Sequence, residues 1–491
     1  MPRVALTGGA YTARSVIASA QRAVNLYAEP MPQAQGEPSQ MAHYPTAGLT
    51  LLLTLPQGPI RGGHRCSNGN VIVVAGSGVY AIAPDASYTH LGDITAGPRT
   101  PVSIADNGNT AVIVDGTPNG WQIDLASLAF SALGGATDDP DGFFSGADRV
   151  DYLDTYFMFN KPNTPQFYIS GSLAVTFDSL DFANKESYSD ILMALIVSRR
   201  EVWLIGSQTT EVWYNYGYTF STTDATAVQF PFQEMEGVFI DRGCVAKYSV
   251  AQTDDVVYWL TQDRGGTGSV LAGSGYKATH VSTPAIEAEF ATYPRIDDAI
   301  GFCYQLAGHR FYVLTFPTAD KTWVYDISTE LWHEAVWLDA NGTEHRHRAN
   351  CAFTAYGLVC CGDWENGNIY AYDLANFTDN GAPIKRLRHF PHMLKDGKRV
   401  FYRQVLLDIE TGTGGHQLPE DPQVFLAWSD DRGHLFGSPV GQTIGASGEY
   451  LTSVQFQRLG MGRDRVFQVQ WSTPYKTALQ GAWVDVAVAQ S

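Results

Sequence analysis

The chain has 491 residues, of which 17% are charged, and it contains 48 glycines and 24 prolines. This length exceeds one ordinary hydrophobic core, and the frequent turn-forming residues are typical of an all-β protein with many short strands. The formal net charge of −18 argues against a protein that grips nucleic acid through its phosphates, because such binding needs clustered lysine and arginine. A negative net charge is compatible with DNA that moves past the protein without binding tightly. It is equally compatible with a charge that only keeps the protein soluble.

Residues 1–55 do not resemble a repeat unit. The first ten residues lack the apolar core of a signal peptide, and no stretch approaches the ~18–20 apolar residues of a membrane span, so we expect no membrane insertion and synthesis in a cytoplasm. Residues 12–19 are compatible with a short helix, whereas residues 25–40 hold prolines and a polar loop that indicate an extended arm. We expect this arm to lie across another surface or another subunit.

A β-hairpin of one design recurs seven times between residues 70 and 373. Each copy has a short apolar strand, a turn with Gly, Pro or Asn, and a second strand with an aromatic or β-branched centre. Successive centres lie 42 to 58 residues apart, which matches propeller blades of roughly 40–50 residues. The hairpins cover residues 70–83, 110–124, 155–169, 201–214, 256–271, 311–326 and 358–373.

An apolar stretch precedes each hairpin and a shorter one follows, which gives four strand-sized pieces per unit. About seven such units can close into a ring in which each blade covers its neighbours. We therefore predict a β-propeller over residues 56–390, with six or eight blades and a pair of ordinary β-sandwiches as alternatives. The longest intervals predict rim insertions at residues 215–237 and 263–276.

A charged break at residues 395–399 precedes five further alternating strands. Residues 391–491 are therefore predicted to form an antiparallel β-sandwich, with an eighth blade as the alternative. The string from Ser429 to Phe436 is similar to the Asp-box turn of sialidases and other propellers. In such a turn a carboxylate accepts hydrogen bonds from turn amides and a glycine adopts positive φ, so Asp431 and Gly433 are assigned a structural role.

Candidate catalytic and metal-binding groups are few and poorly patterned. Glycosidase chemistry needs two carboxylates facing each other across a sugar, but nothing marks a pair among the acidic residues on predicted loops, which are Asp363, Glu365, Asp263, Glu234 and Glu236. His345 and His347, with Cys351 as a third ligand, lack a recognisable zinc spacing. The six cysteines show no CxxC spacing and are expected to be reduced and mostly buried. The sequence thus predicts no enzyme, no cofactor and no metal.

Two sets of residues, one at each end of the chain, carry a resemblance to a known family. The N-terminal set is Tyr11 to Ser15 with Ala18, Gln21, Arg22, Val24, Asn25, Leu26, Tyr27 and Glu29. The C-terminal set is Leu426 to Phe436, Gly448 to Tyr450, Arg458 to Gly460 and Arg463 to Phe467. Both sets resemble the packaged-DNA stabilisation proteins of short-tailed bacteriophages, which form the tail hub or nozzle.

The resemblance implies a homohexameric tube in the virion tail, assembled in the bacterial host cytoplasm. It would dock on the head-to-tail adaptor ring below the portal, retain packaged double-stranded DNA and form the conduit for genome ejection without binding DNA tightly. A tailspike or tail fibre and a tail needle or plug would dock on it in turn. The residues expected to contact the adaptor or an adjacent subunit are Arg14, Gln21, Arg22, Asn25, Tyr27 and Glu29.

Two other classes remain open from the sequence. One is a carbohydrate-binding or glycoside-processing β-propeller, which predicts a monomer or trimer with a carboxylate-lined cleft. The other is an intracellular propeller adaptor, which predicts a monomer with one polar binding rim. Propellers host many unrelated functions, so fold class alone does not decide between them.

Overall fold

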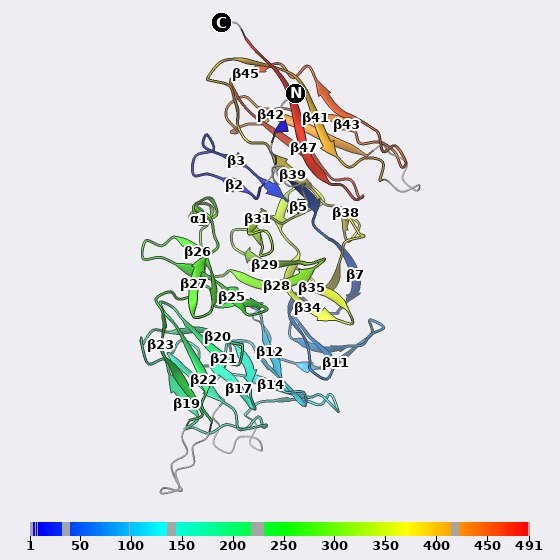
Figure 1. The fold of residues 1–491 in the computed structure, drawn as a ribbon. Coiled ribbons are helices and arrows are strands. Elements are labelled where there is room, and N and C mark those ends of the chain that lie inside the picture. Colours follow the sequence, from blue (N-terminus) through cyan, green and yellow to red (C-terminus); the bar gives the residue numbers. More distant parts are fainter. Residues whose placement is uncertain are drawn as a thin grey trace.

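Seven four-stranded antiparallel units form a closed ring in the computed structural model, which describes residues 3–4, 6, 8–31, 40–97, 99–134, 144–217, 230–413 and 422–489 (Figure 1). The innermost strand of each blade lies beside that of the next, except that β20 of blade four contacts the short helix η1 (Lys247–Ser249) that precedes blade five, and the last blade contacts the first. The prediction of a propeller with about seven blades is therefore confirmed.

The blade strands follow one another along the chain with a single exception. Blades one to three contain β8 (Ile60–Arg65), β9 (Val71–Ala75), β10 (Gly78–Ile82) and β11 (Tyr88–Asp93); β12 (Ser103–Asp106), β13 (Thr110–Val114), β14 (Gly120–Asp124) and β15 (Phe130–Ala132); and β16 (Val150–Leu153), β17 (Tyr156–Asn160), β18 (Gln166–Ile169) and β19 (Phe182–Asn184). Blades four and five contain β20 (Leu192–Ser198), β21 (Glu201–Gly206), β22 (Thr210–Asn215) and β23 (Phe232–Ile240); and β24 (Ala251–Thr253), β25 (Val256–Gln262), β26 (Gly268–Ser274) and β27 (Lys277–His280). Blade six contains β28 (Ile300–Leu306), β29 (His309–Phe316), β30 (Lys321–Asp326) and β31 (Leu331–Glu334).

Blade seven is closed by a strand from the start of the chain. Its inner strands are β34 (Ala349–Ala355), β35 (Leu358–Asp363) and β36 (Asn368–Asp373), and its outermost strand is β7 (Gly48–Thr54), which pairs antiparallel with β36. The prediction had placed these residues in the arm. They form a blade strand because β36 would otherwise present an unpaired edge.

Each blade buries both of its faces, as the continuous apolar strands dictate. All five residues of β9 are buried, and successive side chains point to opposite faces of the sheet. Ile72 and Val74 therefore pack toward blade two, whereas Val71, Val73 and Ala75 pack toward blade seven. Seven such clusters lie between neighbouring blades in the described part of the ring.

The C-terminal part of the chain forms a β-sandwich with the help of N-terminal strands. One sheet contains β1 (Arg3–Val4), β5 (Leu26–Met31), β6 (Gln40–Pro45), β41 (Val400–Ile409), β44 (Val454–Gln457), β45 (Met461–Gly462) and β47 (Leu479–Val488). The other contains β4 (Ala23–Val24), β39 (Arg386–His389), β40 (Met393–Leu394), β42 (Gln423–Ser429), β43 (Val440–Thr443) and β46 (Asp464–Trp471). Their inner faces share a core that includes Leu26, Val405 and Trp471, and the sandwich prediction is confirmed.

A continuous sheet joins the two domains. The short strand β4 pairs in parallel with β31 of blade six and antiparallel with β39 of the sandwich, so ten strands belong to one sheet. In Figure 1 the strands β2 (Tyr11–Thr12), β3 (Ala20–Gln21) and β5 lie where the propeller meets the sandwich. The described part of the predicted arm thus packs on its own chain, and its contact with an adaptor or an adjacent subunit stays a prediction.

Three local predictions need correction. Residues 12–19 are not helical: β2 (Tyr11–Thr12) and β3 (Ala20–Gln21) pair as a hairpin around them. The predicted insertion at 263–276 is mostly β26 with its turns, and the long interval comes instead from the linker that carries α1 (Pro284–Phe290). Thr283 caps this helix and Pro284 occupies its first turn. Of the other predicted insertion, residues 218–229 lie outside the described residues, and 232–237 belong to β23.

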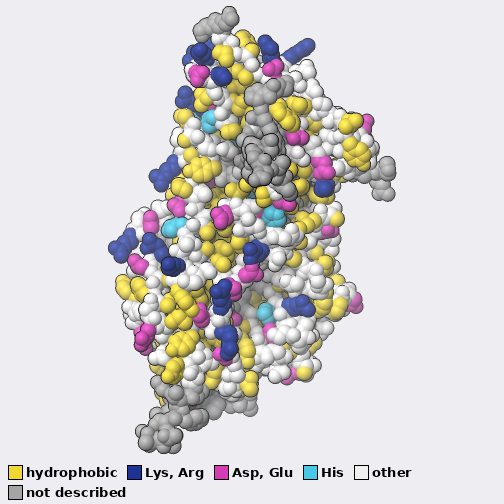
Figure 2. Space-filling view, in the orientation of Figure 1, with side chains coloured by type: hydrophobic (Ala, Val, Ile, Leu, Met, Phe, Trp, Pro, Cys, Tyr) yellow, Lys and Arg dark blue, Asp and Glu magenta, His cyan; other side chains and the backbone are white. Residues whose placement is uncertain are grey.

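Small elements complete the described chain. They are η1 (Lys247–Ser249), the pair β32 (Val336–Leu338) and β33 (Glu344–Arg346), and the pair β37 (Thr378–Asp379) and β38 (Ala382–Pro383). None of the helices in the described ranges is long and apolar enough to cross a bilayer. On the face shown in Figure 2, lysine and arginine are interspersed with aspartate and glutamate.

Candidate functional site

Arg22 lies at the centre of an ion network between the two domains. Its Nε and Nη2 donate to the two carboxylate oxygens of Glu334 at 2.7 Å each, and Nη2 also donates to Glu344 at 2.7 Å. Lys385, which precedes β39, donates to the other oxygen of Glu344 at 2.7 Å. Burial raises the pKa of Glu344, but the charges and hydrogen bonds of Arg22 and Lys385 outweigh it and hold that pKa at about 2. The network thus ties the N-terminal segment, blade six and the sandwich together.

Asn25 makes a second link within the same junction. Its side-chain amide donates to the carbonyls of Val336 at 3.0 Å and Lys385 at 2.8 Å, and its Oδ1 accepts from the Val336 amide at 3.0 Å. The residue is 1% exposed and has φ of 51°, a left-handed conformation in which asparagine is enriched. The Asn25 side chain therefore makes these hydrogen bonds within its own chain.

Arg388 on β39 anchors the segment that precedes β3. Its guanidinium is fully buried and donates to the carbonyls of Leu6 at 3.0 Å and Gly9 at 3.1 Å, and to Oε1 of Gln21 at 2.7 Å. Burial lowers the pKa of Arg388 to about 10. Gln21 is thus a partner of a buried arginine rather than a free surface group.

The remaining members of the predicted set are more accessible. Tyr27 packs edge-on against His309, with ring centroids 4.9 Å apart, and burial raises its pKa to about 12. Glu29 is exposed, with its carboxylate 3.9 Å from Nε2 of His309. Arg14 is exposed in the turn of the β2–β3 hairpin, near Ile17, which is 46% exposed. Contact of the set with an adaptor or adjacent subunit stays a prediction, and Arg14 and Glu29 are the members whose side chains are exposed.

Four histidines around the junction and blades six and seven are held neutral by burial. Burial lowers the pKa of His43 on β6 and of His333 on β31 to about 3, and the pKa of His347 and of His389 to about 4. The positive charge of Arg388 adds to this effect at His43. These imidazoles oppose protonation as long as the chain stays folded.

Asp431 organises the turn after β42. Its carboxylate accepts from the amides of His434 at 3.1 Å and Leu435 at 2.9 Å, and the Ser429 hydroxyl donates to it. These hydrogen bonds, led by that of Leu435, lower the pKa of Asp431. Gly433 has φ of 93°, and a Cβ there would lie 2.9 Å from Cβ of Ala20.

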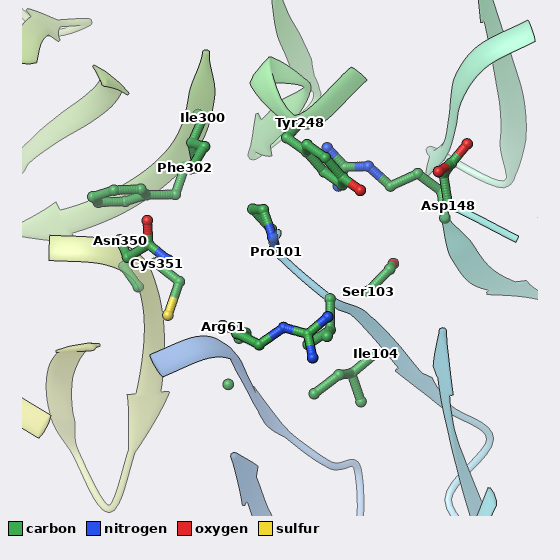
Figure 3. A pocket seen from close by; sticks show the side chains of 16 residues that line it. Arg61, Pro101, Ser103, Ile104, Asp148, Tyr248, Ile300, Phe302, Asn350 and Cys351 are labelled. Carbon is green, nitrogen blue, oxygen red and sulfur yellow. The ribbon is translucent and has the colours of Figure 1, made fainter. Parts of the chain in front are cut away.

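Side chains of the innermost strands line a cavity of about 210 Å³ at the centre of the ring (Figure 3). A second cavity of about 560 Å³ adjoins it and shares Pro101, Asp148, Tyr248 and Ile300. Arg61 donates to the carbonyls of Thr100 at 2.8 Å and Gly76 at 3.1 Å, and its Nη2 lies 3.7 Å from the buried carboxylate of Asp115. Asp148, which lines both cavities, pairs with Lys247. Both cavities are far too small for a nucleic-acid duplex.

The catalytic and metal candidates from the sequence do not converge. Asp363 is fully buried, accepts from Tyr370 at 2.9 Å and pairs with Arg348 at 3.2 Å, so it serves as a structural carboxylate. His345 bonds Asp320 at 2.7 Å. In the part of the chain that is described, the three potential ligands that gather within 4.8 Å are His64, Cys66 and Asp106, which sequence reasoning missed. The sequence feature that could have identified them is the 42-residue separation of His64 and Asp106, which equals one blade interval.

The six cysteines are free thiols, as expected from their spacing. Burial raises the pKa of Cys66 and Cys351 to about 12, which favours the thiol over the nucleophilic thiolate when no metal is bound. Burial raises the pKa of the other four cysteines as well, so none of the six is an activated nucleophile.

The ionisable groups described above are used mainly to join one part of the chain to another. The fold is thus that of a β-propeller fused through a shared sheet to a β-sandwich. Residues 2–376 match the family model described as bacteriophage P22 Gp10, β-propeller, and residues 385–487 match the one described as bacteriophage P22 Gp10, β-sandwich. The chain belongs to the bacteriophage P22 Gp10 family, the phage stabilisation proteins, which are structural and generally non-enzymatic.

Solved structures with similar folds are remote. The N-terminal domain of Nup159 has 9% identity, a TM-score of 0.41, and covers 72% of this chain and 99% of its own. The computationally designed Ika8 protein has 13% identity and a TM-score of 0.36, with 72% and 100% covered, and a chain of a mitotic checkpoint complex has 9% and 0.39, with 70% and 96% covered. Scores this low carry no functional argument. No curated protein matches the chain.

Proposed function

We propose that this protein is the hub or nozzle of a short phage tail, assembled in the host cytoplasm. It would form a homohexameric ring below the head-to-tail adaptor, retain the packaged DNA and provide the exit channel during ejection. The observation that carries the proposal is the match of both domains to the stabilisation-protein family, which leaves only residues 377–384 and the chain ends unmatched.

The charge and the propeller axis support a passage that lies between subunits. The axial cavity of about 210 Å³ does not admit double-stranded DNA, so a channel requires several copies around a common axis. A net charge of −18 favours walls that do not hold phosphate, since each cation–phosphate contact adds binding free energy. DNA would then pass without tight binding.

The fused architecture suits a part that must transmit load between a head and attached tail components. The ten-stranded sheet and the Arg22 network join propeller and sandwich through hydrogen bonds and ion pairs. We propose that one end of this body docks on the adaptor ring, and that a tailspike or tail fibre and a needle or plug dock elsewhere on it.

Electron microscopy of the purified full-length chain, alone and mixed with the purified adaptor ring, tests this function. The expected result is a six-fold ring with an open passage, at least in the presence of adaptor. Mass photometry of the same samples gives the subunit number. A species that remains monomeric with saturating adaptor would contradict the proposal.

A further inference from the structure

Three metal-ligating side chains meet at the boundary between blades one and two. His64 lies on β8, Cys66 follows the end of β8, and Asp106 ends β12. Their ligand atoms, one from each residue, all lie within 4.8 Å of one another. Because β8 and β12 are the innermost strands of adjacent blades, the ring itself brings these residues together.

The carboxylate of Asp106 is oriented by the backbone. Its Oδ1 accepts from the amides of Ser67 and Gly108 at 2.9 Å each, which leaves Oδ2 facing Nε2 of His64 at 2.8 Å. Backbone anchoring of one oxygen while the other faces a histidine is the kind of outer support that orients metal ligands. This arrangement therefore holds two of the donors in place before any ion binds.

The third donor is fixed by the β8–β9 turn. The Cys66 amide donates to the Asn70 carbonyl at 2.8 Å, and its own carbonyl accepts from Gly69 at 2.8 Å. The Cys66 side chain is almost fully buried, whereas 31% of the His64 side chain is exposed. A metal ion can thus enter from solvent beside His64. On the buried side it meets the sulfur of Cys66, which is a soft ligand.

We propose that His64, Cys66 and Asp106 bind one divalent transition-metal ion, with Zn²⁺ favoured by the mixed nitrogen, sulfur and oxygen donors. Water occupies the fourth position. On binding, the six-coordinate aquo ion releases five waters and keeps one, and the Cys66 thiol loses its proton to solvent, with no change in oxidation state. The ion would link blade one, through His64 and Cys66, to blade two, through Asp106. The proposal does not rest on the tail function.

Cobalt titration of the full-length protein, stripped of metal and kept reduced, is the direct test. Saturating Co²⁺ is expected to produce the visible d–d bands of a tetrahedral site together with a thiolate-to-cobalt charge-transfer band, and Zn²⁺ should abolish both. If the folded wild-type chain shows no thiolate-to-cobalt band, the proposal is wrong. This measurement uses the wild-type protein, so its outcome does not depend on whether a variant folds.

Variants assign the ligands. Cys66→Ser should abolish the charge-transfer band, and His64→Gln and Asp106→Asn should each weaken Co²⁺ binding by at least about tenfold. The matched controls are Cys351→Ser, a half-buried thiol of blade seven, and His90→Gln, whose imidazole faces Asp93 without a thiol. Both controls should bind Co²⁺ as the wild type does. A band that persists in Cys66→Ser, or one lost in Cys351→Ser, would overturn the assignment.

Thermal denaturation supplies an independent readout. An ion that binds only the folded chain raises its melting temperature in proportion to the logarithm of ion concentration. Excess Zn²⁺ should therefore raise the melting temperature of the wild type and of Cys351→Ser, but not of Cys66→Ser. Equal shifts in all three proteins would contradict the site.

Discussion

Arg22 and Glu334 form a two-point ion pair, with both nitrogen–oxygen distances at 2.7 Å, although they are 312 residues apart in sequence. The pair is mostly buried, with 25% of the Arg22 and 10% of the Glu334 side chain exposed. It joins the residue that precedes β4 to the end of blade six.

We expect Arg22→Ala to lower the free energy of unfolding by about 2 kcal/mol. Breaking a buried pair costs about 3–5 kcal/mol because the partner charge stays desolvated, and partial exposure reduces this figure. Arg22→Lys should recover only part of the loss, since an ammonium lacks the two-point geometry. Calorimetry measures both. The control is Arg200→Ala, at an exposed pair with Asp154, which should change stability by less than about 0.5 kcal/mol.

Substitution of Asn25 separates its hydrogen bonds from its backbone conformation. Asn25→Gly retains access to φ of 51° but loses three buried hydrogen bonds, so we expect a loss of about 3 kcal/mol at about 1 kcal/mol each. Asn25→Ala should lose about 1 kcal/mol more, because a Cβ is unfavourable in the left-handed region. Equal stabilities of the two variants in urea unfolding would argue against the strain component.

The four neutral histidines predict a loss of stability in mild acid. Burial lowers their pKa to about 3 or 4, against 6.5 in the unfolded chain. Between pH 6.5 and 4 the unfolded state therefore binds more protons, and the free energy of unfolding falls as pH falls, by up to about 1.4 kcal/mol per pH unit for each group. Asp379 opposes this in part, because burial raises its pKa to about 6.

Thermal melts at a series of pH values measure how the free energy of unfolding depends on pH. His43→Gln should flatten the dependence by close to one proton over this window. His345→Gln is the control: the hydrogen bond that His345 donates to Asp320 raises the pKa of His345, so its contribution to stability is present at low pH and lost as pH rises. If His43→Gln leaves the slope unchanged, His43 is not neutral in the folded chain.

The exposed turn of the β2–β3 hairpin carries Arg14, one of the residues predicted to contact a partner. We expect the double variant Arg14→Glu, Ile17→Asp to melt as the wild type does, because both side chains are exposed. If the hairpin contacts the adaptor, binding of that ring should weaken at least tenfold in a pull-down titration. Unchanged binding would remove the hairpin from the interface.

Leu49 on the closing strand β7 is 1% exposed and packs with Phe302 and Tyr370. Leu49→Ala should cost about 2–5 kcal/mol, as core truncations of this kind do. Leu51→Ala is the matched control, because Leu51 lies on the same strand but is 40% exposed. Limited proteolysis should cut Leu49→Ala faster than Leu51→Ala. Similar rates for the two variants would contradict closure of the propeller by β7.

Local patterns predicted much of the fold, and long-range pairing accounts for most errors. The seven hairpins and five sandwich strands were found because alternation, turns and spacing are properties of neighbouring residues. β7 was missed because its partner β36 lies more than 300 residues away, and nothing within residues 48–54 indicates it. The hairpin at 11–21 was mistaken for a helix because its two-residue strands are too short to show a period of two.

The candidate site was less predictable than the fold. The sequence selected Arg22 and Asn25 as interface residues, and that contact stays a prediction. Their partners within the chain could not be identified, because the acceptors near blade six lie more than 300 residues away. His64, Cys66 and Asp106 escaped notice because their proximity depends on how blade two packs beside blade one. Asp431 was recognised from its short turn string, since its partners lie within four residues.

Pairing of β7 with β36 also sets an order of events during synthesis. The N-terminal segment leaves the ribosome first, yet its partner strand follows only after six blades have been translated. Until then the edge of residues 48–54 and the inner faces of the first and seventh blades are uncovered, so the nascent chain is most vulnerable to aggregation and chaperone capture just before translation of blade seven ends.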